Sequence, residues 1–88
     1  GIEQFPEDKQ QSAVIIYPNP AGTTISLLTE SGVKVKSIAI ADMQGKVLLH
    51  QKIADNKPSI NTSSLPAGLY LVRIITNQGV EVQKLLKQ

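Results

Sequence analysis

Several residue types on which protein chemistry depends are scarce or missing in this sequence. Cysteine and tryptophan are absent, and Phe5, Tyr17 and Tyr70 are the only aromatic residues. Without cysteine, the chain has no disulfide, no thiolate metal ligand and no thiol nucleophile. A single histidine, His50, is too few for a typical zinc site, and the seven acidic residues form no loop with calcium spacing. We therefore expect no metal and no cofactor.

Charged residues are few and dispersed. Nine basic and seven acidic residues give a net charge of +2, and the lysines form no run. Nucleic-acid binding usually needs clustered basic residues and aromatic rings on which bases stack, so we expect no nucleic-acid partner. Asp42 and Asp55 flank His50 in the sequence, but nothing specifies a catalytic triad, and there is no glycine-rich phosphate loop. We expect that the chain is not an enzyme and binds no small-molecule ligand.

Long apolar runs are missing as well. No run reaches the length of about 18 residues that indicates a transmembrane helix. The sequence has no secretory signal peptide and begins with Gly1 instead of methionine, so we expect a fragment of a longer protein that carries any such address elsewhere. Residues 1–12 are mostly polar and predict a linker or disordered terminus, which leaves 13–88 as the expected folded domain.

The pattern that is present is that of β-strands. Ile, Leu and Val dominate the apolar residues, and glycine and proline separate short alternating runs. This combination is typical of an all-β domain. A rival helix over 82–87 is too short to be convincing, so we favour a final strand there. We predict an immunoglobulin-like β-sandwich of about seven antiparallel strands. The expected strands lie near 14–17, 23–29, 38–41, 47–50, 59–61, 70–75 and 80–87.

Three four-residue segments that end in glycine predict hairpin turns: 29–32, 42–45 and 76–79. A type I turn favours Asp, Asn or Ser first and Gly fourth, and a glycine with positive φ then forms the bulge that returns the chain. Asp42 with Gly45 fits best, because the Asp carboxylate can accept a hydrogen bond from the backbone two residues on. We expect a positive φ at Gly45.

Prolines mark two further structural features. Pro18-Asn19-Pro20 ends the first predicted strand, and its restricted φ angles predict a rigid loop that sets the direction of the second strand. In the 65–70 segment, Pro66 and Gly68 indicate a type I turn, with close backbone approach as the expected reason for Gly68. Tyr70 follows this turn, as in the tyrosine corner of Greek-key sandwiches, where the hydroxyl bonds back to the backbone. We expect Tyr70 to be structural.

The order of these motifs resembles a known family. In sequence order they are Tyr17-Pro18-Asn19-Pro20, then Asp42-Met43-Gln44-Gly45-Lys46-Val47, the 65–74 segment, and Gly79 followed by Lys84-Leu85-Leu86-Lys87. Over residues 14–88, their order and spacing resemble the type A C-terminal sorting domain of the type IX secretion system.

The resemblance implies a sorting signal that directs a larger cargo protein across the outer membrane of a Gram-negative bacterium, after passage through the periplasm. The implied partners are the outer-membrane secretion machinery and a surface sortase, which would cleave in the linker before Val14. The cargo would reach the cell surface or the medium. We expect the isolated domain to be a monomer.

We predict that the recognised residues are Lys84, Leu85, Leu86 and Lys87, where strand-compatible apolar residues and flanking charge meet at the C-terminal end. A strand in that position suits recognition by strand addition. The lysines also suit protection of an exposed edge against aggregation, and the two interpretations are compatible.

Two functions of other classes stay open at this point. A carbohydrate-binding or adhesive module would need a flat aromatic face or a calcium loop. A structural spacer domain of a secreted enzyme would need no recognition site at all.

Overall fold

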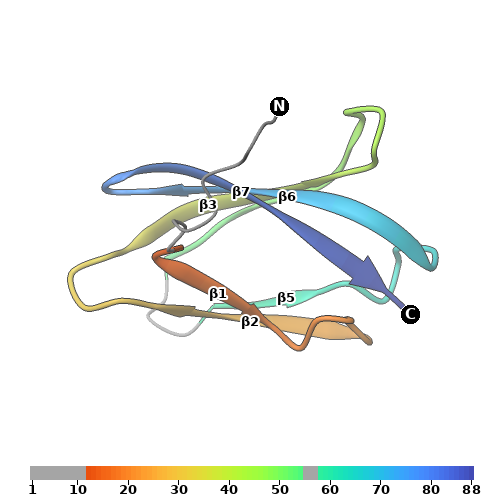
Figure 1. Cartoon of the computed structure of the whole chain (residues 1–88), viewed down its shortest axis with the longest axis horizontal. Helices are drawn as coiled ribbons and strands as arrows, with labels where there is room; N and C mark the ends of the chain where they lie inside the picture. Colours follow the sequence, from red (N-terminus) through yellow and green to blue (C-terminus); the bar gives the residue numbers. More distant parts are fainter. Residues whose placement is uncertain (1–11, 55–57) are drawn as a thin grey trace, which may run out of the picture.

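Two antiparallel sheets packed face to face form the computed structural model, which describes residues 12–54 and 58–88 (Figure 1). The linker prediction for 1–12 falls almost wholly outside these residues. The all-β prediction is confirmed, with seven strands in the described part of the chain. They are β1 (Val14–Tyr17), β2 (Thr24–Thr29), β3 (Val35–Ala41), β4 (Val47–Lys52), β5 (Ser59–Asn61), β6 (Gly68–Thr76) and β7 (Gly79–Lys87).

The order of the strands gives the sandwich its immunoglobulin-like topology. The small sheet has the order β1-β2-β5 and the large sheet the order β4-β3-β6-β7. The pairs β3–β4 and β6–β7 are hairpins, and β3 also pairs with β6. The chain therefore crosses between the sheets after β2, β4 and β5, as in Greek-key sandwiches. Residues 82–87 belong to β7, so the favoured final strand is confirmed over the helix.

Branched aliphatic side chains fill the space between the sheets. Ile25 and Ile60 from the small sheet, and Ile38, Ile40 and Ile74 from the large sheet, are fully buried. Successive residues of a strand point to opposite faces, so alternate side chains of the strands face this core, although those of β4 are at most partly buried. Burial of one such side chain stabilises the fold by about 1.5–3 kcal/mol. The core thus consists of the thin aliphatic layers that the composition indicates.

The turn between β3 and β4 forms as predicted. Asp42 Oδ1 accepts hydrogen bonds from the backbone N–H of Gln44 at 3.0 Å and of Lys46 at 2.9 Å. Gly45 has a φ of 94°, and its N–H donates to the Asp42 carbonyl at 3.0 Å. Residues with a Cβ rarely adopt this φ. Asp42 and Gly45 therefore determine this hairpin.

The other two glycine-terminated segments differ from the prediction. Residues 29–32 form no hairpin, because β2 and β3 lie in different sheets and this turn carries the chain across the sandwich. Residues 76–79 do close a hairpin, but Thr76 pairs directly with Gly79 and the register continues without the predicted bulge. Turn chemistry therefore indicated where the chain bends, but not which strand it meets next.

The tyrosine corner is confirmed, with two corrections to its surroundings. Tyr70 is buried, and its hydroxyl donates to the carbonyl of Pro66 four residues upstream. The turn hydrogen bond in this loop runs from Leu65 N to Thr62 O at 3.0 Å, so the turn lies earlier in the chain than predicted. Gly68 has a φ of 154°, and no atom lies within 4 Å of where its Cβ would be. Backbone conformation, not close approach, is the reason for this glycine.

Candidate functional site

The four predicted recognition residues lie in the second half of β7, at the edge of the large sheet. They do not share one face. Leu85 is fully buried between the sheets and Lys87 is nearly so, whereas Lys84 and Leu86 are exposed on the outside. The alternation follows from the strand geometry. Only Lys84 and Leu86 therefore present whole side chains to a partner in this fold.

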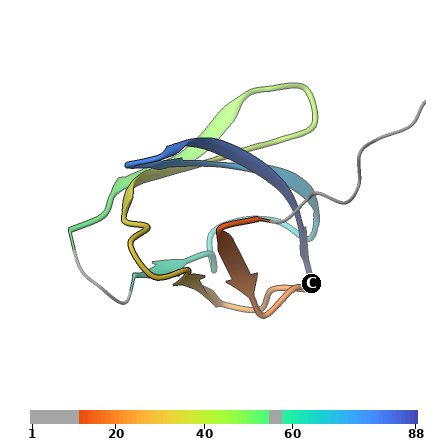
Figure 2. The same ribbon diagram turned by 60° about the vertical axis from the view of Figure 1, so that its left-hand side comes forward.

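The loop after β1 covers the outer edge of this half of β7. The Asn19 side chain donates to Lys84 O at 3.2 Å and accepts from Leu86 N at 3.0 Å. Ala21 N donates to Leu86 O at 2.7 Å, and Gln88 N donates to Ala21 O at 3.0 Å. Figure 2 shows β7 descending from the large sheet to meet this loop. The Pro-Asn-Pro loop thus takes the place of a further strand.

This contact bears on the expectation of strand addition at Lys84–Lys87, which stays a prediction. Strand addition needs free backbone N–H and C=O groups along the edge. At Leu86 both outward groups are already bonded, and so are Lys84 O and Gln88 N. A partner strand would first have to displace the loop. The edge is protected by the loop itself, in addition to any effect of the lysines.

Sequence reasoning missed one residue that holds this loop in place. Thr62 is fully buried; its hydroxyl donates to Gly22 O at 2.9 Å and its N–H to Thr23 O at 2.7 Å. Both prolines of the loop follow cis peptide bonds, and neither has an N–H to donate. The polar Asn19 between them was the one signal in the sequence that a side chain of this loop forms the hydrogen bonds to another strand.

The first half of β7 holds the start of β1. Glu81 and Gln83 point toward the inside of the sandwich and are partly buried. Ala13 N donates to Glu81 Oε2 at 2.8 Å, and Gln83 Nε2 donates to Val14 O at 2.6 Å. These bonds link the first and last strands, although the two belong to different sheets. The sequence alternation at Val80–Gln83 gave no sign of this role.

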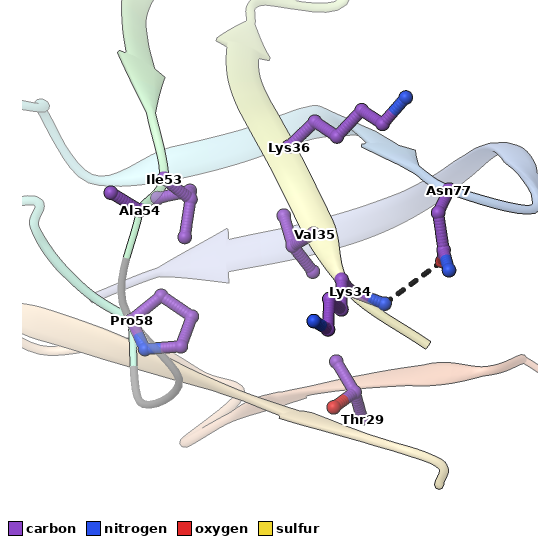
Figure 3. Close-up of a pocket in the computed structure, with 8 residues that line it drawn as sticks. All are labelled: Thr29, Lys34, Val35, Lys36, Ile53, Ala54, Pro58 and Asn77. Atoms are coloured by element: carbon purple, nitrogen blue, oxygen red, sulfur yellow. Dashed lines mark hydrogen bonds between the residues drawn. The ribbon is translucent and has the colours of Figure 1, made fainter. Parts of the chain in front are cut away.

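A hollow of about 370 Å³ opens at one end of the sandwich (Figure 3). The two lysines in it, Lys34 and Lys36, point their amino groups in different directions. The Asn77 amide is used within the fold, since it accepts from Lys34 N at 2.9 Å and donates to Gly32 O at 3.1 Å. These bonds attach the β6–β7 turn to the crossing before β3. The Asn77 amide thus serves the fold.

The single histidine joins no metal-binding cluster in the described part of the chain. His50 is exposed on β4 and lies opposite Ala39 in the strand register. Within 12–54 and 58–88, no three His, Cys, Asp or Glu side chains lie close enough to hold a metal ion. Among these residues there is no helix that is long and apolar enough to cross a membrane.

Comparison with known proteins gives one result. A protein-family model described as the secretion system C-terminal sorting domain matches residues 15–88. Among curated proteins, none matches the sequence. The matched range covers every strand of the sandwich except its first residue, Val14.

Proposed function

This chain belongs to the secretion system C-terminal sorting domain family, and on that premise we propose that its folded sandwich is the unit that the export machinery reads. The domain is the C-terminal sorting signal for type IX secretion and sends a larger protein to the cell surface or the medium. The family match carries this assignment, because it spans the complete sandwich and not one motif. The fold supports reading of the folded state, since residues from both ends of the matched range are bonded to each other.

We propose that the route crosses the periplasm and outer membrane of a Gram-negative bacterium, with the outer-membrane machinery as the direct partner. The domain acts as an address and catalyses no reaction itself. Its one histidine supports this, because His50 stands opposite Ala39, which offers no group for proton transfer.

We also propose that a surface sortase cleaves the chain before β1. From Ala13 onward the backbone is bonded into the sandwich, through Glu81 and Gln83. A protease needs an extended backbone that it can bind, and hydrogen-bonded strands resist this. Cleavage on the N-terminal side of Ala13 is therefore favoured. Mass spectrometry of the exported cargo tests this, and a cargo C-terminus within 13–88 would contradict it.

The test of the sorting function uses a periplasmic reporter in a bacterium that has the type IX system. Residues 1–88 are fused to the C-terminus of the reporter, and the reporter alone is the control. We expect the fusion at the surface or in the medium and the control in the periplasm. A fusion that stays in the periplasm while its sorting domain is folded would contradict the function. Deletion of the secretion system is the second control and should return the fusion to the periplasm.

A further inference from the structure

The outer face of the large sheet is apolar over much of its area. Alternate residues of β7 point away from the core, and Val80 and Val82 are 60% and 57% exposed. On β6, Leu69 and Ile75 also point outward and are exposed. The register pairs Ile75 with Val80 and Leu69 with Leu86, so these side chains are cross-strand neighbours. An exposed apolar face of this kind marks an interaction surface more often than a chance arrangement.

A groove crosses this face. Its floor is formed by Ala39 and Ala41 of β3, whose short side chains leave space between higher walls. Val47 of β4 stands on one side, and Leu71 and Val82 stand on the other. The groove has a volume of about 240 Å³. It is wide enough to receive side chains of a partner, as pockets lined mainly by apolar groups do.

The charges on this face are of one sign. Arg73 lies between Ala39 and Val82 in the register, and Lys84 lies next to Leu71. On β4, Lys52 lies opposite Ser37, in the row that also holds Ile75 and Val80.

No acidic side chain of the described residues lies on the strands at this face. Glu81 points into the sandwich, and Glu30 lies in the crossing from the small sheet. Asp42 follows Ala41 at the margin of the groove, where its carboxylate is bonded to the N–H groups of its own turn. The face therefore combines apolar contact with positive charge.

Resting on the proposed sorting function, we propose that this face docks a protein of the export machinery whose surface carries apolar side chains flanked by carboxylates. The apolar groups would occupy the groove over Ala39 and Ala41. The carboxylates would pair with Arg73, whose planar guanidinium suits bidentate contact, and with Lys84. The charge of the face supports this occupant, because complementary charge fixes the register and speeds encounter.

The experiment compares export of the reporter fusion for two pairs of matched variants. The double variant Arg73→Glu/Lys84→Glu reverses two charges on the face, and Lys34→Glu/Lys36→Glu makes the same charge change at the end of the sandwich. Val82→Ser removes an apolar group from the groove, and Ile15→Ser does so at a residue of the other sheet that is 55% exposed. Thermal unfolding of each variant shows whether it is folded. If the charge-reversed double variant does not fold, Arg73→Gln/Lys84→Gln takes its place.

We expect the face variants to lower the exported fraction about tenfold and the matched controls to leave it within about twofold. Equal export of face and control variants, with the unaltered fusion exported, would overturn the docking surface and leave the sorting function intact. Failure of the unaltered fusion to be exported would instead remove the sorting function and this inference with it.

Two further measurements decide the class of partner. A photo-reactive residue at Val82 is cross-linked during export, and the attached peptide is sequenced. We expect a peptide with Asp or Glu beside apolar residues, and a basic peptide would overturn the proposal.

Vesicles of phosphatidylcholine and phosphatidylglycerol are mixed with the purified chain. Binding that depends on Arg73 and Lys84 would assign the face to a lipid surface and would also overturn the proposal.

Discussion

At the residue scale, Asn19 has the most constrained position in the loop after β1. Its side chain must donate to Lys84 O and accept from Leu86 N at the same time. Among short side chains, an amide supplies both a donor and an acceptor in one plane. The flanking prolines have no N–H, so the loop depends on this side chain and on Ala21 for its contacts with β7. The Pro-Asn-Pro sequence is therefore suited to covering a strand edge.

Replacement of Asn19 tests this reading. We expect Asn19→Ala to lower the free energy of unfolding by about 1 kcal/mol, since two hydrogen bonds to β7 are lost but water can reach the groups. The amide of Leu86 should exchange with solvent faster in this variant, as measured by NMR. Gln78→Ala, in the exposed β6–β7 turn, is the control and should change stability by less than about 0.5 kcal/mol. Unchanged exchange at Leu86 would show that Asn19 does not hold the strand.

A second residue-scale prediction concerns Gly45. Its φ of 94° is unfavourable for a residue with a Cβ, although no atom lies within 4 Å of the Cβ position. Gly45→Ala should therefore cost about 1–2 kcal/mol through backbone strain alone. Gly22 has an equally open Cβ position and no positive φ, so Gly22→Ala is the matched control and should be nearly neutral. Equal melting temperatures for the two variants in calorimetry would contradict the strain argument.

At the scale of elements, β7 has a different contact on each of its sides. It pairs with β6 along its full length, its first half holds the start of β1, and its second half meets the Pro-Asn-Pro loop. Its outward-facing side chains are left for a partner. The strand thus connects β1 and the Pro-Asn-Pro loop to the large sheet, and it also forms part of the face proposed for docking.

The two adjacent leucines of β7 separate these roles. Leu85 is fully buried and Leu86 is 43% exposed. Leu85→Ala should lower the free energy of unfolding by about 2–5 kcal/mol, because it leaves a cavity in the core. Leu86→Ala should cost less than about 1 kcal/mol. Urea unfolding measures both, and similar losses for the two variants would contradict the assigned directions of the side chains.

Deletion of residues 85–88 tests the role of the strand end in export. We expect the shortened reporter fusion to remain in the periplasm, because the deletion removes the core contact of Leu85 and the partners of the loop. Circular dichroism of the shortened chain shows whether it still folds. A shortened chain that is folded and still exported would rule out this end of β7 as part of the signal.

At the scale of the whole molecule, the first and last strands hold the two sheets together. Hydrogen bonds that involve the side chains of Glu81, Gln83 and Asn19 join segments that are more than sixty residues apart in the sequence. Loss of β7 would therefore release β1 and the loop as well as the edge of the large sheet. Such mutual dependence favours cooperative unfolding.

We accordingly predict one unfolding transition for the complete domain. Circular dichroism reports the strands, and the fluorescence of buried Tyr70 and exposed Tyr17 reports the core and the loop region. The curves from the two methods should coincide in urea. An earlier transition in either signal would show that β7 or the loop detaches before the rest of the sandwich.

The location of most strands and the hairpin at Asp42–Gly45 followed from the sequence because their causes are local. Alternation with a period of two predicts a strand, and an Asp carboxylate with a following glycine predicts the turn between two of them. The tyrosine corner is equally local, since Tyr70 and Pro66 are four residues apart. The destination of the 29–32 turn was not predictable in this way, because it depends on which sheet β3 joins.

The candidate site was predictable only in part. The family resemblance placed it in β7, but the sequence of Val80–Gln83 reads as apolar and polar in alternation without stating which face is inside. In the structure, the valines are outside and the polar Glu81 and Gln83 are inside. Leu85 lies two residues after Gln83 and four after Glu81, so all three side chains point to the same face of the strand. Burial of Leu85 and the hydrogen bonds to the start of β1 therefore fix together which face of β7 is inside.

The sequence by itself determined the class of fold, the strands, the β3–β4 turn and the family, because each rests on spacing along the chain. Tertiary structure alone decided that the Pro-Asn-Pro loop occupies the edge of β7, and that an apolar, positively charged face is turned outward. The physical reason is that a strand has two faces and two edges, and their partners come from distant segments. Only packing of the whole sandwich determines which face is buried and which edge is covered.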